Sequence, residues 1–237
     1  MKRCFVSTSV YALAHQLGMQ GAIDEVKRQL DAPDKDSLPV VRTIARLRKL
    51  DIEVDLVVDG GATYIGMARS RMFHEAMKRE VPWISLDDDV EVTTDCAAAM
   101  FAALEDIAPR IVLVPYYTRD QANPQLTITL PIVRDDHVRN GAKLLTLPKG
   151  QGGGFGMVGM NVLALRAVAA AAEEACMQWF DYGERKLAVF FEMLDEGFWH
   201  GEDTSFFKYR VPSEVTVEAL LVGTVVHAGV GLRLDSL

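Results

Sequence analysis

Apolar blocks alternate with amphipathic blocks along the first half of the chain. The segment "IEVDLVVD" alternates and then becomes apolar, which is typical of a strand, whereas "TYIGMARSRMFHEAMKRE" repeats its pattern at helical spacing. Strands and helices alternating at such spacing form a parallel sheet covered on both faces. The pattern therefore predicts an α/β fold with a mostly parallel central sheet. The expected strands are 4–10, 52–59, 82–86 and 110–117, and the expected helices follow residue 10 and cover 39–50, 63–80 and 94–107.

The second half of the chain is less regular. We expect a strand over 125–133, a glycine-rich loop over 147–160, a helix over 161–180 and strand-like runs within 215–232. No internal repeat, low-complexity tract or interdomain linker is visible, and a chain of 237 residues fits one large domain. The sequence therefore predicts a single domain over 1–237.

Polar residues follow several of the expected strands at the point where each strand ends. Ligands of such sheets bind beyond the carboxyl ends of the strands. We therefore expect these polar residues to converge on one rim of the sheet: Ser7, Thr8, Ser9, Asp59, Asp87, Asp88, Asp89, Tyr116 and Tyr117.

Three consecutive aspartates, Asp87, Asp88 and Asp89, follow the apolar segment "PWISL". Adjacent carboxylates repel one another and are almost never buried unpaired, so a positive group is expected beside them. Mg²⁺ and Mn²⁺ prefer oxygen ligands and often share their coordination positions with substrate phosphates. Alternation along a strand directs Asp87 and Asp89 to one side, so this pair suits a metal and Asp88 a ribose hydroxyl. An exposed acidic turn is the alternative.

Other charged side chains belong to the same hypothesis. Arg69 and Arg71 begin a predicted helix and are candidates to contact phosphate, with ordinary surface arginines as the alternative. Glu202 and Asp203 are adjacent carboxylates in "FWHGEDTSFFKYR", where a plain helix cap is the alternative. His227, in the apolar "GTVVHAGVG", is either a core histidine or a metal ligand. The residue pattern leaves these alternatives open.

Residues 154–159 match the dinucleotide-binding pattern GxGxxG and precede a predicted helix. The preceding "TLPKGQG" is not a buried strand, and Glu174, the candidate ribose-binding acid, lies inside the helix instead of at the end of a second strand. A nicotinamide cofactor is therefore not expected. Glycines also let the backbone approach a bulky ligand closely, and we expect this loop to cover the rim.

Composition narrows the class of protein. Hydrophobic residues make up 49% of the chain, enough for a packed core, and we find neither a signal peptide nor a segment of transmembrane length. The three cysteines are odd in number, far apart and in apolar contexts. We therefore expect reduced core thiols in a cytoplasmic protein. The net charge of −8 disfavours a general nucleic-acid binder.

One basic helical face is an exception to this acidity. Arg42, Arg46 and Lys49 share a face of the helix predicted over 39–50. This face is either an ordinary solvated helix surface or a binding site for an acidic acceptor or nucleic acid. With a later basic group, this face keeps modified DNA as a less favoured acceptor. The later group consists of Arg134, Arg139, Lys143 and Lys149.

Several segments, taken in order, resemble a GT-A-type glycosyltransferase that carries a DxD motif. They are "VDGGATYIGMARSRMFHEAM", "VPWISLDDDVEV", "VLVPYYTRD", "GGGFGMVGMNVLALR", "GEDTSFFKYR" and "VVHAGV". The resemblance runs from about residue 52 to residue 230, and the aspartate triplet followed by the GED segment is its most specific part. It implies a single Rossmann-like GT-A domain, in which about 1–115 bind the nucleotide sugar and about 116–237 bind the acceptor.

The resemblance also implies an activity and site roles. The activity is transfer of a hexosyl or pentosyl group from a nucleoside diphosphate sugar, by default a UDP-sugar, to an acceptor hydroxyl. Asp89 and His227 would bind Mn²⁺ or Mg²⁺, with Asp87 on the metal shell or the sugar–ribose side. Asp203 matches the general base of inverting members, and Glu202 adjoins it. The nucleotide-sugar candidates are Ser7, Thr8, Asp59, Arg69, Asp87 and Asp88, and the acceptor candidates are Tyr116, Gly154, Gly156, Trp199 and His200.

The chain departs from part of the family pattern. It has "SFFKYR" where many processive inverting members have Q-x-x-R-W, and it lacks their transmembrane segments. A polysaccharide synthase is therefore not expected, and the stereochemical outcome stays open. So does the acceptor, which is a glycan, a protein, a small molecule or a hydroxymethylated DNA base.

Two other functions compete with glycosyl transfer. A nucleotidyltransferase making a nucleotide sugar would place a glycine-rich segment with Lys or Arg after the first strand, where "VSTSVYALAH" has neither. A non-catalytic sugar- or nucleotide-binding module would not need both acidic clusters.

Overall fold

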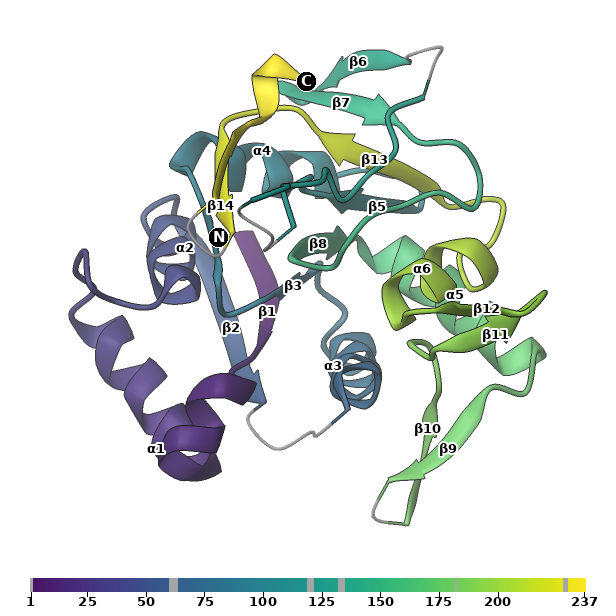
Figure 1. Cartoon of the computed structure of the whole chain (residues 1–237), viewed down its shortest axis with the longest axis horizontal. Helices are drawn as coiled ribbons and strands as arrows, with labels where there is room; N and C mark the ends of the chain where they lie inside the picture. The colour runs from purple at the N-terminus through teal and green to yellow at the C-terminus, as the bar shows by residue number, and fades with distance from the viewer. Residues whose placement is uncertain (1, 60–63, 119–121, 132–134, 182, 228–229) are drawn as a thin grey trace.

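A computed structural model describes the chain except for residues 1, 60–63, 119–121, 132–134, 182 and 228–229 (Figure 1). Within the described residues, the centre of the molecule is an eight-stranded sheet with the order β2–β1–β3–β8–β5–β13–β7–β6. The strands are β1 (Lys2–Ser9), β2 (Ile52–Asp59), β3 (Trp83–Leu86), β5 (Arg110–Leu113), β6 (Asp136–Arg139), β7 (Ala142–Thr146), β8 (Met157–Met160) and β13 (Thr216–Leu220).

Most strands of this sheet run in the same direction. β1 is parallel to β2 and β3, and β5 is parallel to β13. β8 lies antiparallel between β3 and β5, so that β3 and β5 share a direction. β7 is antiparallel to both β13 and β6. The expected α/β class with a mostly parallel central sheet is confirmed.

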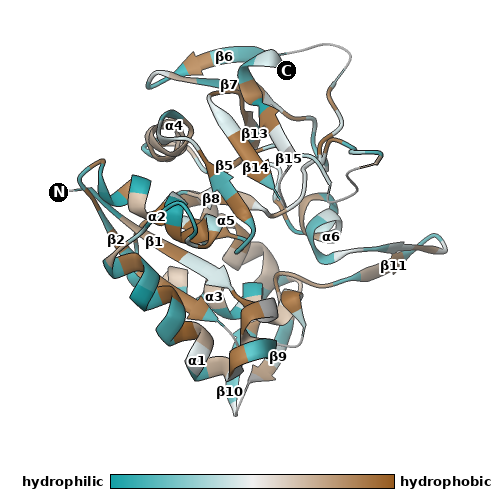
Figure 2. Ribbon diagram, turned by 60° about the vertical axis from the view of Figure 1, so that its left-hand side comes forward, coloured by the Kyte–Doolittle hydropathy of each residue, from teal (hydrophilic) through white to brown (hydrophobic). Residues whose placement is uncertain are grey.

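Helices cover both faces of the sheet (Figure 1). One buried apolar cluster contains residues of α1, α2 and α4, and a second contains residues of α3, α5 and α6. The exposed side of α1 is mostly hydrophilic (Figure 2), but it includes the exposed Leu17 and Met19. No helix in the described part of the chain is long and apolar enough to cross a membrane. The helices are α1 (Tyr11–Asp31), α2 (Pro39–Arg48), α3 (Ile65–Arg79), α4 (Thr94–Leu104), α5 (Val162–Glu174) and α6 (Glu202–Tyr209).

Smaller strand pairs extend from this core. β14 pairs with both β4 and β15, and the β4 pairing sets His227 opposite Val90. It therefore brings the late histidine beside the turn that holds the three aspartates. The β11–β12 hairpin projects from the body of the molecule (Figure 2). The elements are β4 (Val90–Val92), β9 (Gln178–Asp181), β10 (Glu184–Leu187), β11 (Met193–Asp195), β12 (Phe198–His200), β14 (Thr224–His227), β15 (Val230–Arg233) and the 3₁₀ helix η1 (Leu234–Ser236).

The prediction of a strand over 125–133 was wrong for the residues that the structure describes there. Leu126 makes only an isolated bridge to Tyr117. Pro124 precedes the segment and Pro131 lies within it, and proline has no N–H group for a strand ladder. Residues 126–129 instead line a cavity.

The glycine-rich segment also differs from the prediction. Its last four residues form β8, a buried strand between β3 and β5. Gly159 allows α4 to pack against this strand, because a Cβ atom there would lie 2.7 Å from Cδ1 of Leu104. The pattern of residues did not predict this strand, because glycine is a weak strand signal and Gly159 is required by a contact with α4, which is distant in the sequence.

The helix expected over 161–180 is shorter than predicted. α5 ends at Glu174, and β9 begins at Gln178. Cys176 lies between them with a φ of 52°, in the left-handed region that a helix does not use. Its side chain is exposed, whereas Cys4 and Cys96 are buried, so the expectation of three core thiols was wrong at Cys176.

Candidate active site

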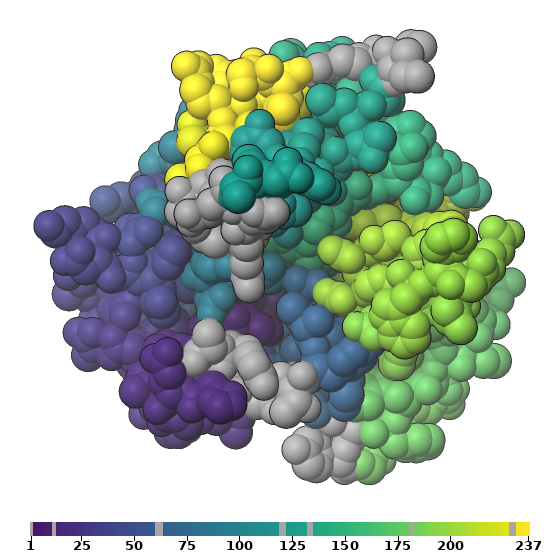
Figure 3. Space-filling view, in the orientation of Figure 1, coloured from purple at the N-terminus to yellow at the C-terminus, as the bar shows by residue number. Residues whose placement is uncertain are grey.

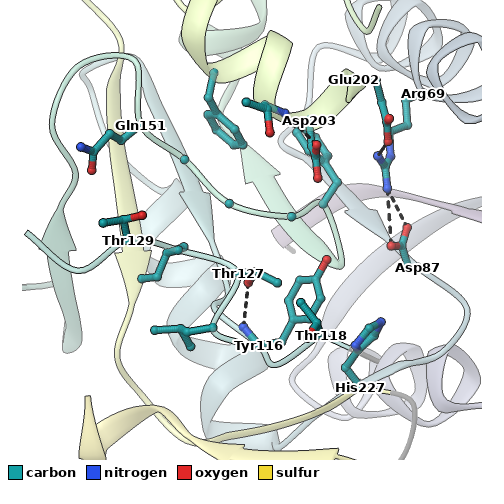
Figure 4. Close-up of a pocket in the computed structure, with 18 of the residues that line it drawn as sticks. Arg69, Asp87, Tyr116, Thr118, Thr127, Thr129, Gln151, Glu202, Asp203 and His227 are labelled. Carbon is teal, nitrogen blue, oxygen red and sulfur yellow. Dashed lines mark hydrogen bonds and ion pairs between the residues drawn. The ribbon is translucent and has the colours of Figure 1, made fainter. Parts of the chain in front are cut away.

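The carboxyl ends of β1, β2, β3 and β5 lie at one edge of the sheet, as the sequence predicted. β1 and β2 end side by side at Ser9 and Asp59, and the aspartate turn follows β3 directly. A cavity of about 720 Å³ lies beyond these strand ends, between the segment 150–155, the loop after β5 and the start of α6 (Figure 4). The face seen in Figure 3 is hollowed near its middle, between the blue N-terminal segments and the green to yellow-green ones.

Arg69 links two elements at the edge of this cavity. Its side chain is only 7% exposed and comes from the first turns of α3. Nη2 lies 3.1 Å from Oδ1 of Asp87, and Nη1 donates to Oε1 of Glu202 at 2.5 Å (Figure 4). The guanidinium also lies over the ring of Phe155, 4.9 Å from its centroid. A positive group was expected beside the aspartates, and for Asp87 this group is Arg69 of the protein itself.

Glu202 and Asp203 occupy the first turn of α6, and Gly201 is the N-cap. Asp203 is therefore not the N-cap of α6, which was the alternative to a functional role. Burial raises the pKa of Glu202, and the neighbouring Arg69 cation opposes this rise only in part. Asp203 lines the cavity and accepts a hydrogen bond from the Thr204 N–H at 2.7 Å. Both carboxylates line the cavity, but Glu202 pairs with Arg69, whereas Asp203 has no arginine partner among the described residues.

His227 is oriented through both of its ring nitrogens. Nδ1 lies 2.8 Å from the carbonyl oxygen of Tyr117, which can only accept, so Nδ1 carries a proton and donates it. Nε2 lies 3.4 Å from Oδ2 of Asp89. A neutral imidazole would therefore direct a lone pair at a carboxylate oxygen. A proton on Nε2, or a cation bound between the two groups, removes this repulsion.

The donor set of Asp89 and His227 suits a divalent cation. A hydrogen bond from the second ring nitrogen to a carbonyl is typical of metal-binding histidines. Within the described residues, no cluster of three His, Cys, Asp or Glu side chains is able to hold a metal by itself. Two protein ligands nevertheless match the behaviour of Mg²⁺, which takes its remaining ligands from water and substrate phosphates.

Tyr116 packs between the glycine-rich segment and His227. Its ring centroid lies 4.5 Å from that of His227. A Cβ atom at Gly154 would lie 2.1 Å from the Tyr116 hydroxyl oxygen, and one at Gly156 would lie 2.6 Å from Cε1. Burial, with the nearby Asp87 charge, raises the pKa of Tyr116 above its ordinary value. These two glycines are therefore required by contact with a protein side chain.

Four nucleotide-sugar candidates do not line this cavity. The buried Ser7 hydroxyl accepts a hydrogen bond from the Trp83 indole at 2.8 Å. Thr8 is also buried, and its hydroxyl has no hydrogen-bond partner within the described residues. Asp59 ends β2, and Asp88 lies in the turn after β3, where its carbonyl accepts from the backbone of α2. Their roles in nucleotide binding remain predictions.

Two acceptor candidates lie on the projecting β11–β12 hairpin. Trp199 is 67% exposed, and neither it nor His200 is among the residues lining the cavity. His200 packs near Tyr209, with ring centroids 6.0 Å apart. The structure therefore brings Tyr116 and Gly154 to the cavity and leaves this pair outside it.

The basic face of α2 has a structural role. Arg42 and Arg46 both pair with Glu91 of β4, at 2.6 Å and 2.5 Å, and Arg46 also donates to the Val92 carbonyl. Arg139 pairs with Glu218. Arg42 and Arg46 are therefore paired within the protein instead of free on a solvated face, whereas Lys49 and Lys149 are exposed. Binding of nucleic acid by these basic groups stays a prediction. Arg134, from the later basic group, lies outside the described residues.

The sequence reasoning missed the neutral polar wall of the cavity. This wall consists of Thr118, Thr127, Thr129 and Gln151. The alternation of threonines with apolar residues in "QLTITL" was taken as a strand signal. It is a weak signal for a site, because the same alternation describes many half-exposed strands.

No protein-family model and no curated protein matches the chain. Among solved structures, A197 from STIV is similar to it, with a TM-score of 0.51 and 14% identity, over 99% of this chain and 91% of that chain. A glycosyltransferase involved in the glycosylation of the major capsid of PBCV-1 gives a TM-score of 0.42 and 9% identity. That match covers 92% of this chain and 81% of that chain. A protein assigned as a glucose-1-phosphate thymidylyltransferase from Bacillus anthracis, in complex with a sucrose, gives a TM-score of 0.38 and 12% identity. That match covers 100% of this chain and 93% of that chain. At these identities, the likeness to A197 shows a shared fold alone, and the two lower scores support no further argument.

Proposed function

We propose that the protein is a metal-dependent glycosyltransferase that moves a sugar from a nucleoside diphosphate sugar to an acceptor hydroxyl. The main support is that two different functional groups line one cavity at the carboxyl edge of the sheet. One is His227, paired with Asp89, and the other is the carboxylate of Asp203. A binding module would need only the first.

The two groups have complementary tasks. Mn²⁺ or Mg²⁺ bound by Asp89 and His227 would stabilise the negative charge that grows on the leaving diphosphate. Asp203 accepts the acceptor hydroxyl proton while the acceptor oxygen bonds to the anomeric carbon and the bond from that carbon to the diphosphate breaks. General-base help of this kind contributes roughly 10²–10⁴-fold.

Arg69 supports this arrangement without contributing free charge. Its guanidinium is divided between Asp87 and Glu202, so it fixes the end of β3 relative to the start of α6. Asp203, the next residue after Glu202, is thereby held at a constant position relative to the aspartate turn. Positioning of this precision matters, because misplacement by about 1 Å can cost roughly 10²-fold in rate.

A thermal-shift panel of nucleoside diphosphate sugars, with and without Mn²⁺, tests the proposal. A donor at about a hundred times its dissociation constant should add about 2.7 kcal/mol to the free energy of unfolding. For a domain of this size, each kcal/mol moves Tm by about 2–4 °C. We test UDP-sugars first and expect a shift that requires Mn²⁺ and is lost in Asp89→Ala and His227→Ala.

Asp36→Ala is the matched control, because Asp36 is exposed and is not among the residues that line the cavity. It should keep the full shift. A metal-dependent shift that survives in Asp89→Ala would contradict the metal assignment, and the absence of any donor shift would contradict the whole proposal. Release of pyrophosphate from a nucleoside triphosphate and a sugar phosphate would show a nucleotidyltransferase instead.

A further inference from the structure

The cavity has two chemically different ends. Arg69, Asp87 and His227 lie at one end, whereas Thr129 and Gln151 lie at the opposite end, and Asp203 lies between them (Figure 4). We call the end formed by Thr127, Thr129 and Gln151, together with the peptide groups of residues 152–154, the neutral end. It continues beyond the residue proposed to accept the hydroxyl proton.

Hydrogen-bonding groups at the neutral end remain open to a ligand. The hydroxyl oxygen of Thr127 accepts from the backbone N–H of Tyr116 at 3.2 Å, and within the described residues its own proton has no acceptor. The side chains of Thr129 and Gln151 have no hydrogen-bond partner within the described residues, and neither do the peptide groups of residues 152–154. Hydroxyls, amides and peptide groups both donate and accept, as sugar hydroxyls do.

The neutral end has no cationic side chain among the described residues that line the cavity, and its hydrogen-bond donors are uncharged. Of the charged side chains lining the cavity, Arg69 is the only Arg or Lys within the described residues, and its cation is held by Asp87 and Glu202. Asp203 adds a third carboxylate. A phosphate or sulfate at the neutral end would lie towards the Asp203 carboxylate without a free cation among the described residues to offset the repulsion, which is unfavourable at short distances. Charge therefore selects against phosphorylated acceptors and nucleic-acid backbone.

The shape of this wall is fixed by the protein. A Cβ atom at Gly152 would lie 2.0 Å from Cγ of Phe207, and one at Gly153 would lie 2.6 Å from Cγ2 of Ile128. Both apolar side chains also line the cavity. Apolar groups next to donors and acceptors match the two surfaces of a sugar ring, which has C–H faces and a rim of hydroxyls.

We infer that the neutral end is the acceptor subsite and takes an uncharged carbohydrate, with Thr129 and Gln151 binding its hydroxyl groups. The inference rests on the proposed glycosyltransferase function and narrows its acceptor class. The acceptor hydroxyl that reacts points towards Asp203, and the remainder of the sugar occupies the neutral end. Duplex DNA carrying a hydroxymethylated base is the competing acceptor, and the test includes it.

The test compares acceptors with the donor identified by thermal shift and with Mn²⁺ present. The panel contains neutral methyl glycosides and oligosaccharides, sugar phosphates and hydroxymethylated duplex DNA, and mass spectrometry identifies the product. We expect transfer to neutral glycosides. Gln151→Ala and Thr129→Val should each raise KM for the acceptor by roughly threefold to tenfold, the loss expected for one hydrogen bond. The donor-induced thermal shift should stay unchanged in both variants.

Gln125→Ala is the control, since Gln125 lies on the same segment but not in the cavity, and its KM should match the unmodified protein. The inference is overturned if the donor binds but no neutral glycoside is modified, if DNA or a sugar phosphate is the better acceptor, or if both variants keep the original KM. Failure of every donor to bind is a different result, because it rejects the proposed function itself.

Discussion

Two clusters of charged side chains, one built around the buried Arg69 and the other around the buried Glu218, allow a direct comparison within the molecule. The cavity cluster consists of Arg69, Asp87, Glu202 and Asp203, at the carboxyl edge of the sheet. The closed cluster consists of Arg110, Arg139, His137, Asp106 and Glu218, around β13 and the amino end of β5. Both join segments far apart in the sequence, but they differ in charge balance and in access to solvent.

The closed cluster is compensated internally. Oε1 of the fully buried Glu218 lies 2.9 Å from Nη1 of Arg110, 3.1 Å from Nη1 of Arg139 and 2.9 Å from Nε2 of His137. Asp106 accepts a hydrogen bond from Arg110 and lies 3.3 Å from Nε of Arg139. Two carboxylates thus face two guanidinium groups, and none of these side chains lines the cavity.

The cavity cluster is not balanced in this way. One guanidinium pairs with two carboxylates, and a third carboxylate, Asp203, lines the cavity without an arginine partner among the described residues. Buried ion pairs by themselves are thus a poor sign of function in this protein, since the closed cluster has more of them. Excess charge at the carboxyl edge of the sheet, next to a cavity, is the more informative feature.

The largest effect that separates the two clusters is expected at Asp203. Asp203→Asn keeps the oxygen that accepts from the Thr204 N–H but removes the basic carboxylate. We expect kcat to fall by roughly 10²–10⁴-fold with little change in Tm or in the donor-induced shift. Steady-state kinetics and thermal denaturation measure this. Asp36→Asn is the control, and a variant with unchanged kcat would remove Asp203 from the mechanism.

A second, smaller effect is expected in the closed cluster. Glu218→Gln leaves Arg110 and Arg139 with one carboxylate between them in a buried environment. Removing one partner of a buried ion pair typically costs about 3–5 kcal/mol of stability. Urea denaturation should show this loss, while kcat below the unfolding transition should stay unchanged. A large fall in kcat without loss of stability would show that the closed cluster is functional after all.

The smallest effect concerns the pH dependence of stability, which should have opposite signs in the two clusters. Burial opposes ionisation of Asp106, but hydrogen bonds from Arg110 and from backbone N–H groups outweigh it and lower its pKa. Its contribution to stability is therefore present above the ordinary value of 3.8 and is lost as the pH falls through the lowered pKa.

Glu202 behaves in the opposite way because burial raises its pKa. Its contribution to stability is fully present below the ordinary value of 4.5 and is lost as the pH rises through the raised pKa. The free energy of unfolding, measured by urea denaturation across these pH ranges, checks both signs. Glu202→Gln should flatten the slope above pH 4.5, and Asp106→Asn the slope below pH 3.8. Equal slopes in Glu202→Gln and the unmodified protein would contradict the role of burial.

Much of the fold follows from the local pattern of residues. The strand predicted over 52–59 is β2, and the strand predicted over 82–86 is β3 with one residue fewer. Alternation of strands and helices was sufficient to predict the rim, because the carboxyl ends of parallel strands share an edge of the sheet. This alternation identified the aspartate turn, whereas the GED segment was identified by its adjacent carboxylates and by the resemblance to GT-A-type glycosyltransferases.

The contacts that define the site depended on the tertiary structure. Arg69 and Glu202 are 133 positions apart, and Asp89 meets His227 only because β4 and β14 pair. Local periodicity carries no information about which distant charges will be paired. Sequence alone therefore identified the residues that are chemically able to bind or react. Strand order and packing decided which of them form ion pairs within the protein, as Arg42 does, and which line a cavity, as Asp203 does.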